Sequence, residues 1–177
     1  MKNAIVALAV MLGAVSSFAG GSSSVTFESV TDRVTKEKTD VQYYRMSNDL
    51  GNGLSFNVQA RNGRAVSTGA LSQSLEGGLS SSVGPVFVGA GLGHDFGVKE
   101  YNYGYVIGGV AAPVGPVVAN AGIKYSAGLT GSNPSSTLVF AGVSYPVTKT
   151  VAVEGGLTRS YRDFKENALN VGIKFNY

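Results

Sequence analysis

The last residues of the chain alternate between apolar and polar side chains. The apolar positions are Leu169, Val171, Ile173, Phe175 and Tyr177, and every position between them is Asn, Gly or Lys. Successive side chains of a β-strand point to opposite faces of the sheet, so a period of two predicts a strand with one apolar and one polar face. The segment 169–177 gives the clearest structural signal in the sequence.

The same alternation recurs upstream at regular spacing. Four further segments of alternating apolar residues begin at Leu54, Val86, Val117 and Val151. The intervals between these starts are about 32, 31 and 34 residues. The sequence Val-Gly-Pro-Val occurs twice, at 83–86 and at 114–117. A repeat of this length matches one two-stranded hairpin with its turn and loop.

These repeats predict an all-β protein of about ten antiparallel strands joined in sequence. Strands in one direction are expected at about 24–31, 53–62, 85–94, 116–127 and 150–161, and the returning strands at about 41–48, 69–80, 101–112, 136–146 and 167–177. Eight strands is the alternative, because the hairpin 24–48 alternates least regularly.

The connections between the predicted strands are of two kinds. Tight connections are expected at 49–52, 81–84, 113–115 and 146–149, and longer, more polar ones at 32–40, 63–68, 95–100, 128–135 and 162–166. Short turns at one end and longer loops at the other are typical of bacterial outer-membrane barrels, with turns in the periplasm and loops outside the cell. We therefore expect a closed, antiparallel, up-and-down transmembrane β-barrel.

The segment 106–123 tests this interpretation, because only Asn120 is polar in it and it could be a transmembrane helix. Pro113, Gly115 and Pro116 lie in its middle. Two prolines and a glycine within four residues break a helix but suit a tight turn between strands. The segment is therefore read as two strands and their turn.

The N-terminus has the three parts of a secretory signal peptide. Lys2 supplies a positive charge, 4–15 is apolar, and small residues at Ser17 and Ala19 precede a cleavage point before Gly20. We expect residues 1–19 to be removed and 20–177 to form one barrel domain.

The composition differs from that of a soluble domain. Charged residues make up 14% of the chain, against ~25% in soluble domains, and 25 residues are Gly.

A final strand that ends on an aromatic residue resembles the C-terminal signature of bacterial outer-membrane proteins, here carried by Phe175 and Tyr177. The pattern of the whole chain from residue 20 is similar to that of small outer-membrane barrels of the OmpA/OmpX type. The resemblance implies the barrel fold, a place in the bacterial outer membrane and recognition of the last strand by the barrel-assembly machinery. It transfers no active site.

Charged residues in the middle of strands are expected to face the lumen, since an ionised group facing lipid at mid-bilayer costs roughly 2–4 kcal/mol. This predicts a lumen charge network of Glu28, Arg45, Glu76, Glu154 and Lys174, all about three or four residues up their strands from the turn end. We expect Glu154 to pair with Lys174 and Glu28 with Arg45, with Lys174 and Glu28 as an alternative pair because the closing strand neighbours the first. Tyrosines are expected to form girdles near the strand ends at positions 103, 105, 125, 145, 161 and 177.

The sequence offers little catalytic or metal chemistry. His94 is the one histidine and there is no Cys, so a transition-metal site and a Ser–His–acid triad both lack residues. The run 89–93 is rich in Gly, but it lies within a strand and no helix follows, so it is no phosphate loop. The net charge of +3, without a Lys/Arg cluster, does not favour nucleic acid. We expect a non-enzyme without cofactor or metal.

Two membrane functions remain open at this point, and a soluble secreted β-protein, which would need no detergent, is a third and weaker option. One is a structural or narrow-pore barrel whose lumen network either plugs or filters the channel. The other is a surface-interaction module, in which the charged loop 32–40 contacts lipopolysaccharide or a partner. The expected partners are outer-membrane lipid and lipopolysaccharide, and the sequence leaves the oligomeric state open.

Overall fold

The computed structural model describes residues 20–97, 100–130 and 133–177, so the predicted signal peptide, residues 1–19, lies outside the described residues. The described chain forms strands joined in sequence: β1 (Gly21–Asp32), β2 (Lys38–Gly51), β3 (Leu54–Ala65), β4 (Leu71–Val83), β5 (Val86–Asp95), β6 (Tyr101–Val114), β7 (Val117–Gly128), β8 (Ser135–Pro146), β9 (Val151–Arg162) and β10 (Glu166–Asn176). Each predicted strand has its counterpart, with ends that differ by a few residues. Within these ranges, no helix is long and apolar enough to cross a membrane.

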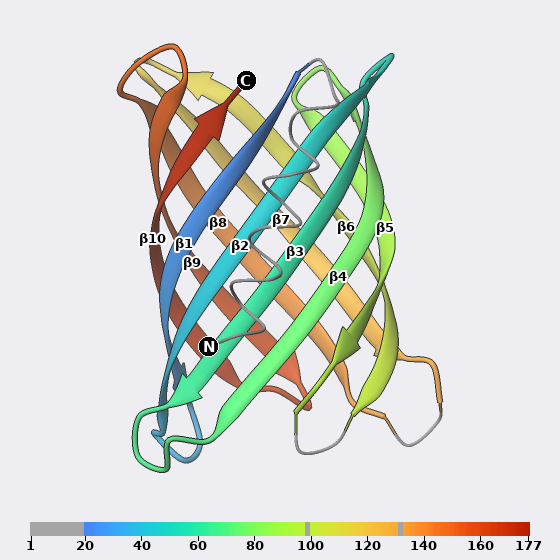
Figure 1. Ribbon diagram of the computed structural model, residues 1–177, viewed down its shortest axis with the longest axis vertical. Helices are drawn as coiled ribbons and strands as arrows, with labels where there is room; N and C mark the ends of the chain where they lie inside the picture. Colours follow the sequence, from blue (N-terminus) through green and yellow to red (C-terminus); the bar gives the residue numbers. More distant parts are fainter. Residues whose placement is uncertain (1–19, 98–99, 131–132) are drawn as a thin grey trace.

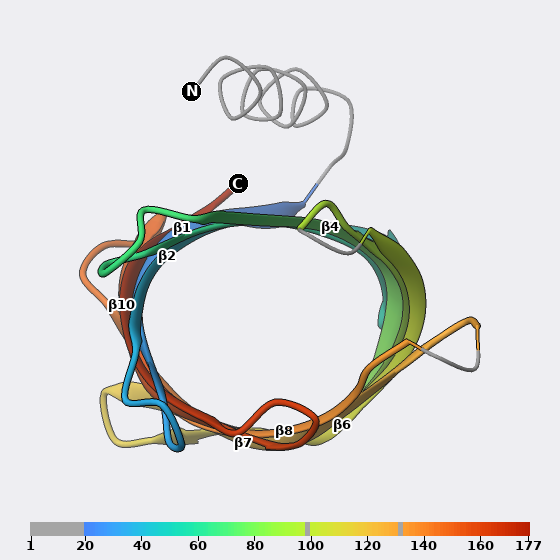
Figure 2. The same cartoon turned by 90° about the horizontal axis from the view of Figure 1, so that it is seen from below.

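The strands close into a barrel in which each one pairs with its neighbours in sequence (Figures 1 and 2). Closure is made by β1 and β10, which pair antiparallel from Ser22–Asn176 to Asp32–Glu166. The predicted fold class, a closed antiparallel up-and-down barrel, is confirmed. The eight-stranded alternative is wrong, because the weakly alternating first hairpin forms a full pair, with β1 bonded to β2 from Gly21–Asn48 to Thr31–Lys38.

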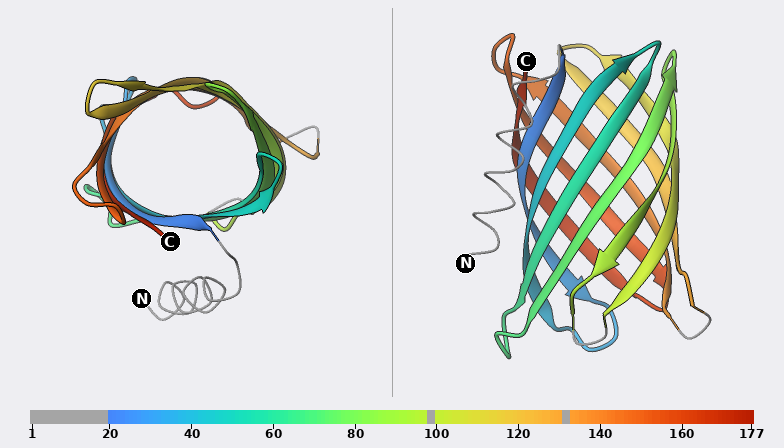
Figure 3. Two further views of the ribbon diagram at one scale, coloured as in Figure 1. Left: turned by 90° about the horizontal axis from the view of Figure 1, so that it is seen from above. Right: turned by 45° about the vertical axis from the view of Figure 1, so that its right-hand side comes forward.

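The tight turns follow from residues that accept a positive φ. Asn52 and Gly53 connect β2 to β3 with φ of 55° and 73°, as a two-residue hairpin turn of the primed kind requires. The repeated Val-Gly-Pro-Val sequences place Gly84 and Gly115 at φ of 59° and 60°, each followed by a proline. These turns share one end of the barrel with the C-terminus, and the longer loops lie at the other end (Figures 1 and 3).

The barrel presents its apolar side chains outward. Leu169 and Leu157 are 63% and 61% exposed, whereas the inward Glu28 is 7% exposed. The buried apolar core is small, consisting of Val30, Val41 and Ala168 with Tyr43 packed against them. A soluble protein rarely exposes so much apolar surface in one patch, whereas a transmembrane barrel needs an apolar outer band.

Candidate functional site in the barrel lumen

The five residues of the predicted network line one cavity of about 700 Å³ inside the barrel. They are Glu28 on β1, Arg45 on β2, Glu76 on β4, Glu154 on β9 and Lys174 on β10. Each lies at an inward-facing position of its strand, because alternate residues of a strand face opposite sides. The lumen is therefore polar and charged where the outer face is apolar.

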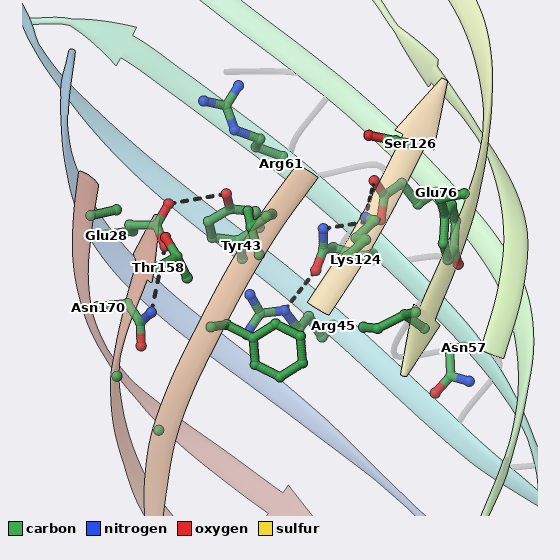
Figure 4. A pocket seen from close by; sticks show the side chains of 18 of the residues that line it. Glu28, Tyr43, Arg45, Asn57, Arg61, Glu76, Lys124, Ser126, Thr158 and Asn170 are labelled. Atoms are coloured by element: carbon green, nitrogen blue, oxygen red, sulfur yellow. Dashed lines mark hydrogen bonds and ion pairs between the residues drawn. The ribbon is translucent and has the colours of Figure 1, made fainter. Parts of the chain in front are cut away.

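A salt bridge crosses the lumen at its centre, between Glu76 on β4 and Lys124 on β7 (Figure 4). Lys124 Nζ lies 2.5 Å and 2.6 Å from the two carboxylate oxygens of Glu76. Strands β5 and β6 separate β4 from β7, so this pair is a chord of the barrel and not a contact between neighbouring strands. The two side chains are 11% and 17% exposed.

Neutral donors and an aromatic ring complete the surroundings of this ion pair. The hydroxyl of Tyr103 donates to Glu76 Oε1 at 2.9 Å, and Gln59 Nε2 donates to Oε2 at 3.3 Å. Lys124 Nζ lies 4.4 Å from the ring centroid of Tyr105, within the range of a cation–π contact. A buried ion pair is stable only when its remaining donors and acceptors are satisfied in this way.

Arg45 extends the network toward β2. Its Nε donates to Gln59 Oε1 at 2.7 Å, so the Gln59 amide accepts from Arg45 and donates to Glu76. The Arg45 guanidinium also lies 4.8 Å from the ring centroid of Tyr43. Gln59 thereby bridges Arg45 and Glu76, which form no salt bridge with each other.

Glu28 is held by neutral groups. The Tyr43 hydroxyl donates to Glu28 Oε1 at 3.1 Å, and Asn170 Nδ2 donates to Oε2 at 3.5 Å (Figure 4). These contacts join β10, β1 and β2 at the closure of the barrel. The lumen therefore holds one connected set of polar side chains that runs from β10 around to β7.

The expected ion pairs, including the alternative between Lys174 and Glu28, are wrong. In the part of the chain that the structure describes, the one salt bridge is Glu76–Lys124. Glu154 lies opposite Gly172 while Lys174 lies opposite Ala152, so the two are offset along their strands. Glu28 and Arg45 are offset further, because Glu28 lies opposite Val41 and Arg45 opposite Ser24.

Sequence reasoning missed the partners that Glu76 and Arg45 use. Lys124 lies on the same face of its strand as Asn120, and Gln59 on the same face as Asn57. The period of two therefore assigns Lys124 and Gln59 to the polar face. Within the strand boundaries expected from the sequence, Lys124 lies farther from the turn end than the five predicted residues do, so counting residues from the turns does not place it beside them. Strand stagger, which alternation does not encode, brings it level with Glu76.

Two of the tyrosines expected in interfacial girdles are instead inside the barrel. Tyr103 and Tyr105 line the cavity, and each ring lies over an inward glycine of β5. A Cβ on Gly93 would collide with the Tyr103 ring, and a Cβ on Gly91 would lie 2.6 Å from Tyr105 Cζ. Inward glycines therefore make room for the aromatic rings of the next strand. Tyr125, Tyr145, Tyr161 and Tyr177 do face outward, with 37%, 51%, 40% and 39% exposure.

The C-terminal signature residues Leu169, Val171, Ile173, Phe175 and Tyr177 all face outward and are exposed. The backbone of Tyr177 bonds to Gly21 in both directions, at 3.0 Å and 3.1 Å, and its hydroxyl donates to Asn48 Oδ1 at 3.2 Å. The end of the chain therefore helps to close the barrel at the turn end.

His94 lies near the loop end of β5, where its Nδ1 is 2.8 Å from Asn102 Oδ1 and its ring packs on Phe96. Among the described residues, no three His, Cys, Asp or Glu side chains are arranged to hold a metal ion.

No protein-family model and no curated protein matches the sequence. Several solved structures are similar. The translocator domain of the autotransporter NalP from Neisseria meningitidis aligns at 9% identity with a TM-score of 0.55, over 99% of this chain and 95% of that one. The KdgM porin in complex with disordered oligogalacturonate aligns at 8% identity and a TM-score of 0.50, over 90% and 99%. Neisserial surface protein A aligns at 14% identity and 0.46, over 89% and 96%. At these identities the likeness concerns the fold, and the chain has the fold of outer-membrane β-barrel proteins.

Proposed function

We propose that the protein is an integral barrel of the bacterial outer membrane that forms a narrow, water-filled pore for small ions and small hydrophilic solutes. The cavity carries this proposal. It is lined from Ser22 at the turn end to Pro134 and Phe164 in the loops at the other end, and between them by polar side chains and by the stacked rings of Phe87 and Phe140. The apolar outer face and the signal-like N-terminus support the location.

The size of the cavity supports a narrow pore. The 12 residues of β9 rise ~3.3 Å each and, at a tilt of ~40°, span roughly 30 Å along the barrel axis. A cavity of about 700 Å³ over this height has a mean cross-section on the order of 20 Å². Water and small ions fit such a passage.

The passage is proposed to run along β8 and β9. Consecutive residues line the cavity at 141–143 on β8 and 154–158 on β9, as they also do at 45–47 on β2 and 57–59 on β3. Consecutive residues can do so only where the backbone is uncovered, because their side chains point alternately in and out. Strands β8 and β9 carry no residue of the hydrogen-bonded network, which runs from β10 around to β7. Their inward Gly142 and Gly156 have no side chain, and the side chains nearest to them are those of Asn120 and Asn170.

Conductance with single cysteines tests the pore and its route. The chain has no Cys, so a single introduced thiol is the only reactive one. Thr158 lines the cavity and its neighbour Leu157 is 61% exposed on the outer face, which makes Leu157→Cys the matched control for Thr158→Cys. Wild-type protein in planar bilayers should show small steps of ion current. A cationic methanethiosulfonate reagent should reduce them several-fold in Thr158→Cys and leave Leu157→Cys unchanged.

Two results would contradict the proposal. If folded wild-type protein, verified by heat-modifiable gel mobility, carries no current, then the network is a plug and the barrel is structural. If both cysteine variants respond equally to the reagent, the ions do not pass along β9.

A further inference from the structure

Three arginines and two tyrosines gather on the outer face of the barrel at its loop end. The guanidinium carbons of Arg33 and Arg159 lie 5.2 Å and 5.3 Å from the ring centroid of Tyr161, and that of Arg162 lies 4.9 Å from the ring of Tyr125. All are cation–π distances. We call these five residues the arginine–tyrosine cluster.

The register of the strands places the cluster at the boundary of the apolar band. Thr137 of β8 lies opposite Tyr125 of β7 and opposite Tyr161 of β9, so both tyrosines belong to one row across three strands. On β9 the outward residues run from Leu157 to Arg159 to Tyr161, so the cluster begins where the apolar side chains end. Arg33 reaches this row from the loop after β1. The backbone N–H of Arg33 donates to Lys165 O at 2.7 Å, which ties this loop to the one after β9.

The positive charges of the cluster have no carboxylate partner in the described residues, where the one salt bridge is Glu76–Lys124. Arg33 Nη2 donates to the backbone oxygen of Ser160 at 2.8 Å, and Arg162 Nε donates to Thr137 Oγ1 at 3.1 Å. The nearby Asp163 accepts from the backbone N–H of Ser135 at 2.6 Å. Arg33 Nε is buried and lacks a hydrogen-bond acceptor among the described residues.

We propose that the arginine–tyrosine cluster binds the phosphate groups of lipid A, the phosphorylated glycolipid anchor of lipopolysaccharide in the outer leaflet. Guanidinium groups bind phosphate oxygens with paired N–H donors, and three lie within reach of one row of tyrosines. Tyrosine rings are favoured at the headgroup level. The acyl chains would lie along the outward Leu157, Val139 and Leu169, which are 61%, 44% and 63% exposed. The choice of the outer leaflet follows from the longer loops at this end.

Binding of defined lipids to the full-length barrel, purified in detergent, tests this proposal. The probes are bisphosphorylated lipid A, the same lipid after phosphatase treatment, and phosphatidylglycerol, each titrated by native mass spectrometry. The test variant is Arg159→Gln with Arg162→Gln. Arg64→Gln is the matched control, because Arg64 is an exposed arginine at the loop end of β3, outside the cluster.

The wild type and Arg64→Gln should bind bisphosphorylated lipid A equally, and the double variant should lose at least tenfold in affinity. Arg159→Lys with Arg162→Lys keeps the charges and should lose less, which separates binding from folding if the Gln variant assembles poorly. Unchanged affinity in the Gln variant, or equal binding of the dephosphorylated lipid, would overturn the proposal. Equal binding of phosphatidylglycerol would also overturn it, because any anionic lipid would then satisfy the arginines.

Discussion

Lys124 and Glu76 are 48 residues apart in the sequence, and their side chains meet inside the barrel with Nζ 2.5 Å from Oε1. Two strands separate them around the wall, so their salt bridge ties β7 to β4 through the lumen. Each charge is largely removed from water, at 17% and 11% exposure, and therefore depends on the other. The pair is the one place in the described lumen where opposite charges are in direct contact.

Breaking this pair on one side should cost more stability than removing both charges. Lys124→Met leaves the Glu76 carboxylate in the lumen with neutral donors only, and loss of one member of a buried pair costs about 3–5 kcal/mol. The double variant Lys124→Met with Glu76→Gln should be milder than Lys124→Met alone, because no charge is then left unpaired. Urea unfolding in lipid vesicles measures the four free energies of this double-mutant cycle.

The residues Glu154 and Lys174 provide the matched control for that cycle. Both line the same cavity, but neither forms a salt bridge in the described part of the chain. Glu154→Gln and Lys174→Met should therefore have additive effects on the free energy of unfolding. Additive effects for Lys124 and Glu76 would show instead that their contact contributes nothing to stability.

The contrast between these two pairs shows what the sequence could predict. The period of two assigned Glu76, Lys124, Glu154 and Lys174 to the inner face, and Gly-Pro and Asn-Gly turns fixed where strands end. Alternation carries no information on stagger, however. Lys174 and Arg45 both lie opposite Ser24, Arg45 lies opposite Gln59, and Gln59 lies opposite Glu76, so one row of pairs climbs from the turn end toward the loops. Alternation therefore assigned these four side chains to the correct face, whereas counting residues from the turns predicted the wrong partners.

A charge on the outer face should be tolerated far less than the same charge on the inner face. Val171 lies in the middle of β10 and is 58% exposed to the outside, so Val171→Arg should cost about 2–4 kcal/mol. The neighbouring Asn170 points inward and donates to Glu28, so Asn170→Arg places a guanidinium beside a carboxylate and should cost much less. Folding into lipid vesicles measures both values, and equal costs would contradict the assignment of faces.

The absence of a side chain at Gly93 is expected to make room for the ring of Tyr103. The three atoms nearest to a Cβ on Gly93 belong to the side chain of Tyr103, so Gly93→Ala should destabilise the barrel by about 1–3 kcal/mol through overpacking. The same substitution in a Tyr103→Ala background should cost little. Gly77→Ala is the control, because nothing lies within 4 Å of a Cβ at Gly77. Thermal unfolding in detergent compares the wild type, the two single variants, the double variant and the Gly77→Ala control. If Gly93→Ala costs as much stability in the Tyr103→Ala background as in the wild type, the backbone and not the ring is the cause.

The last strand is expected to direct assembly in the cell beyond its role in stability. Phe175 is 47% exposed on the outer face near the turn end, where lipid-facing charges cost only about 0–1 kcal/mol, so Phe175→Asp should still fold in detergent. In cells the same variant should fail to reach the outer membrane, because the terminal aromatic signature is lost, while Phe175→Tyr should assemble normally. Deleting Asn176 and Tyr177 should fail in both settings, since it removes the backbone bonds from Tyr177 to Gly21 and from Asn176 to Thr150 O at 2.8 Å. Membrane fractionation and heat-modifiable gel mobility separate the two effects. Normal membrane levels of Phe175→Asp would mean that the assembly machinery does not read this position.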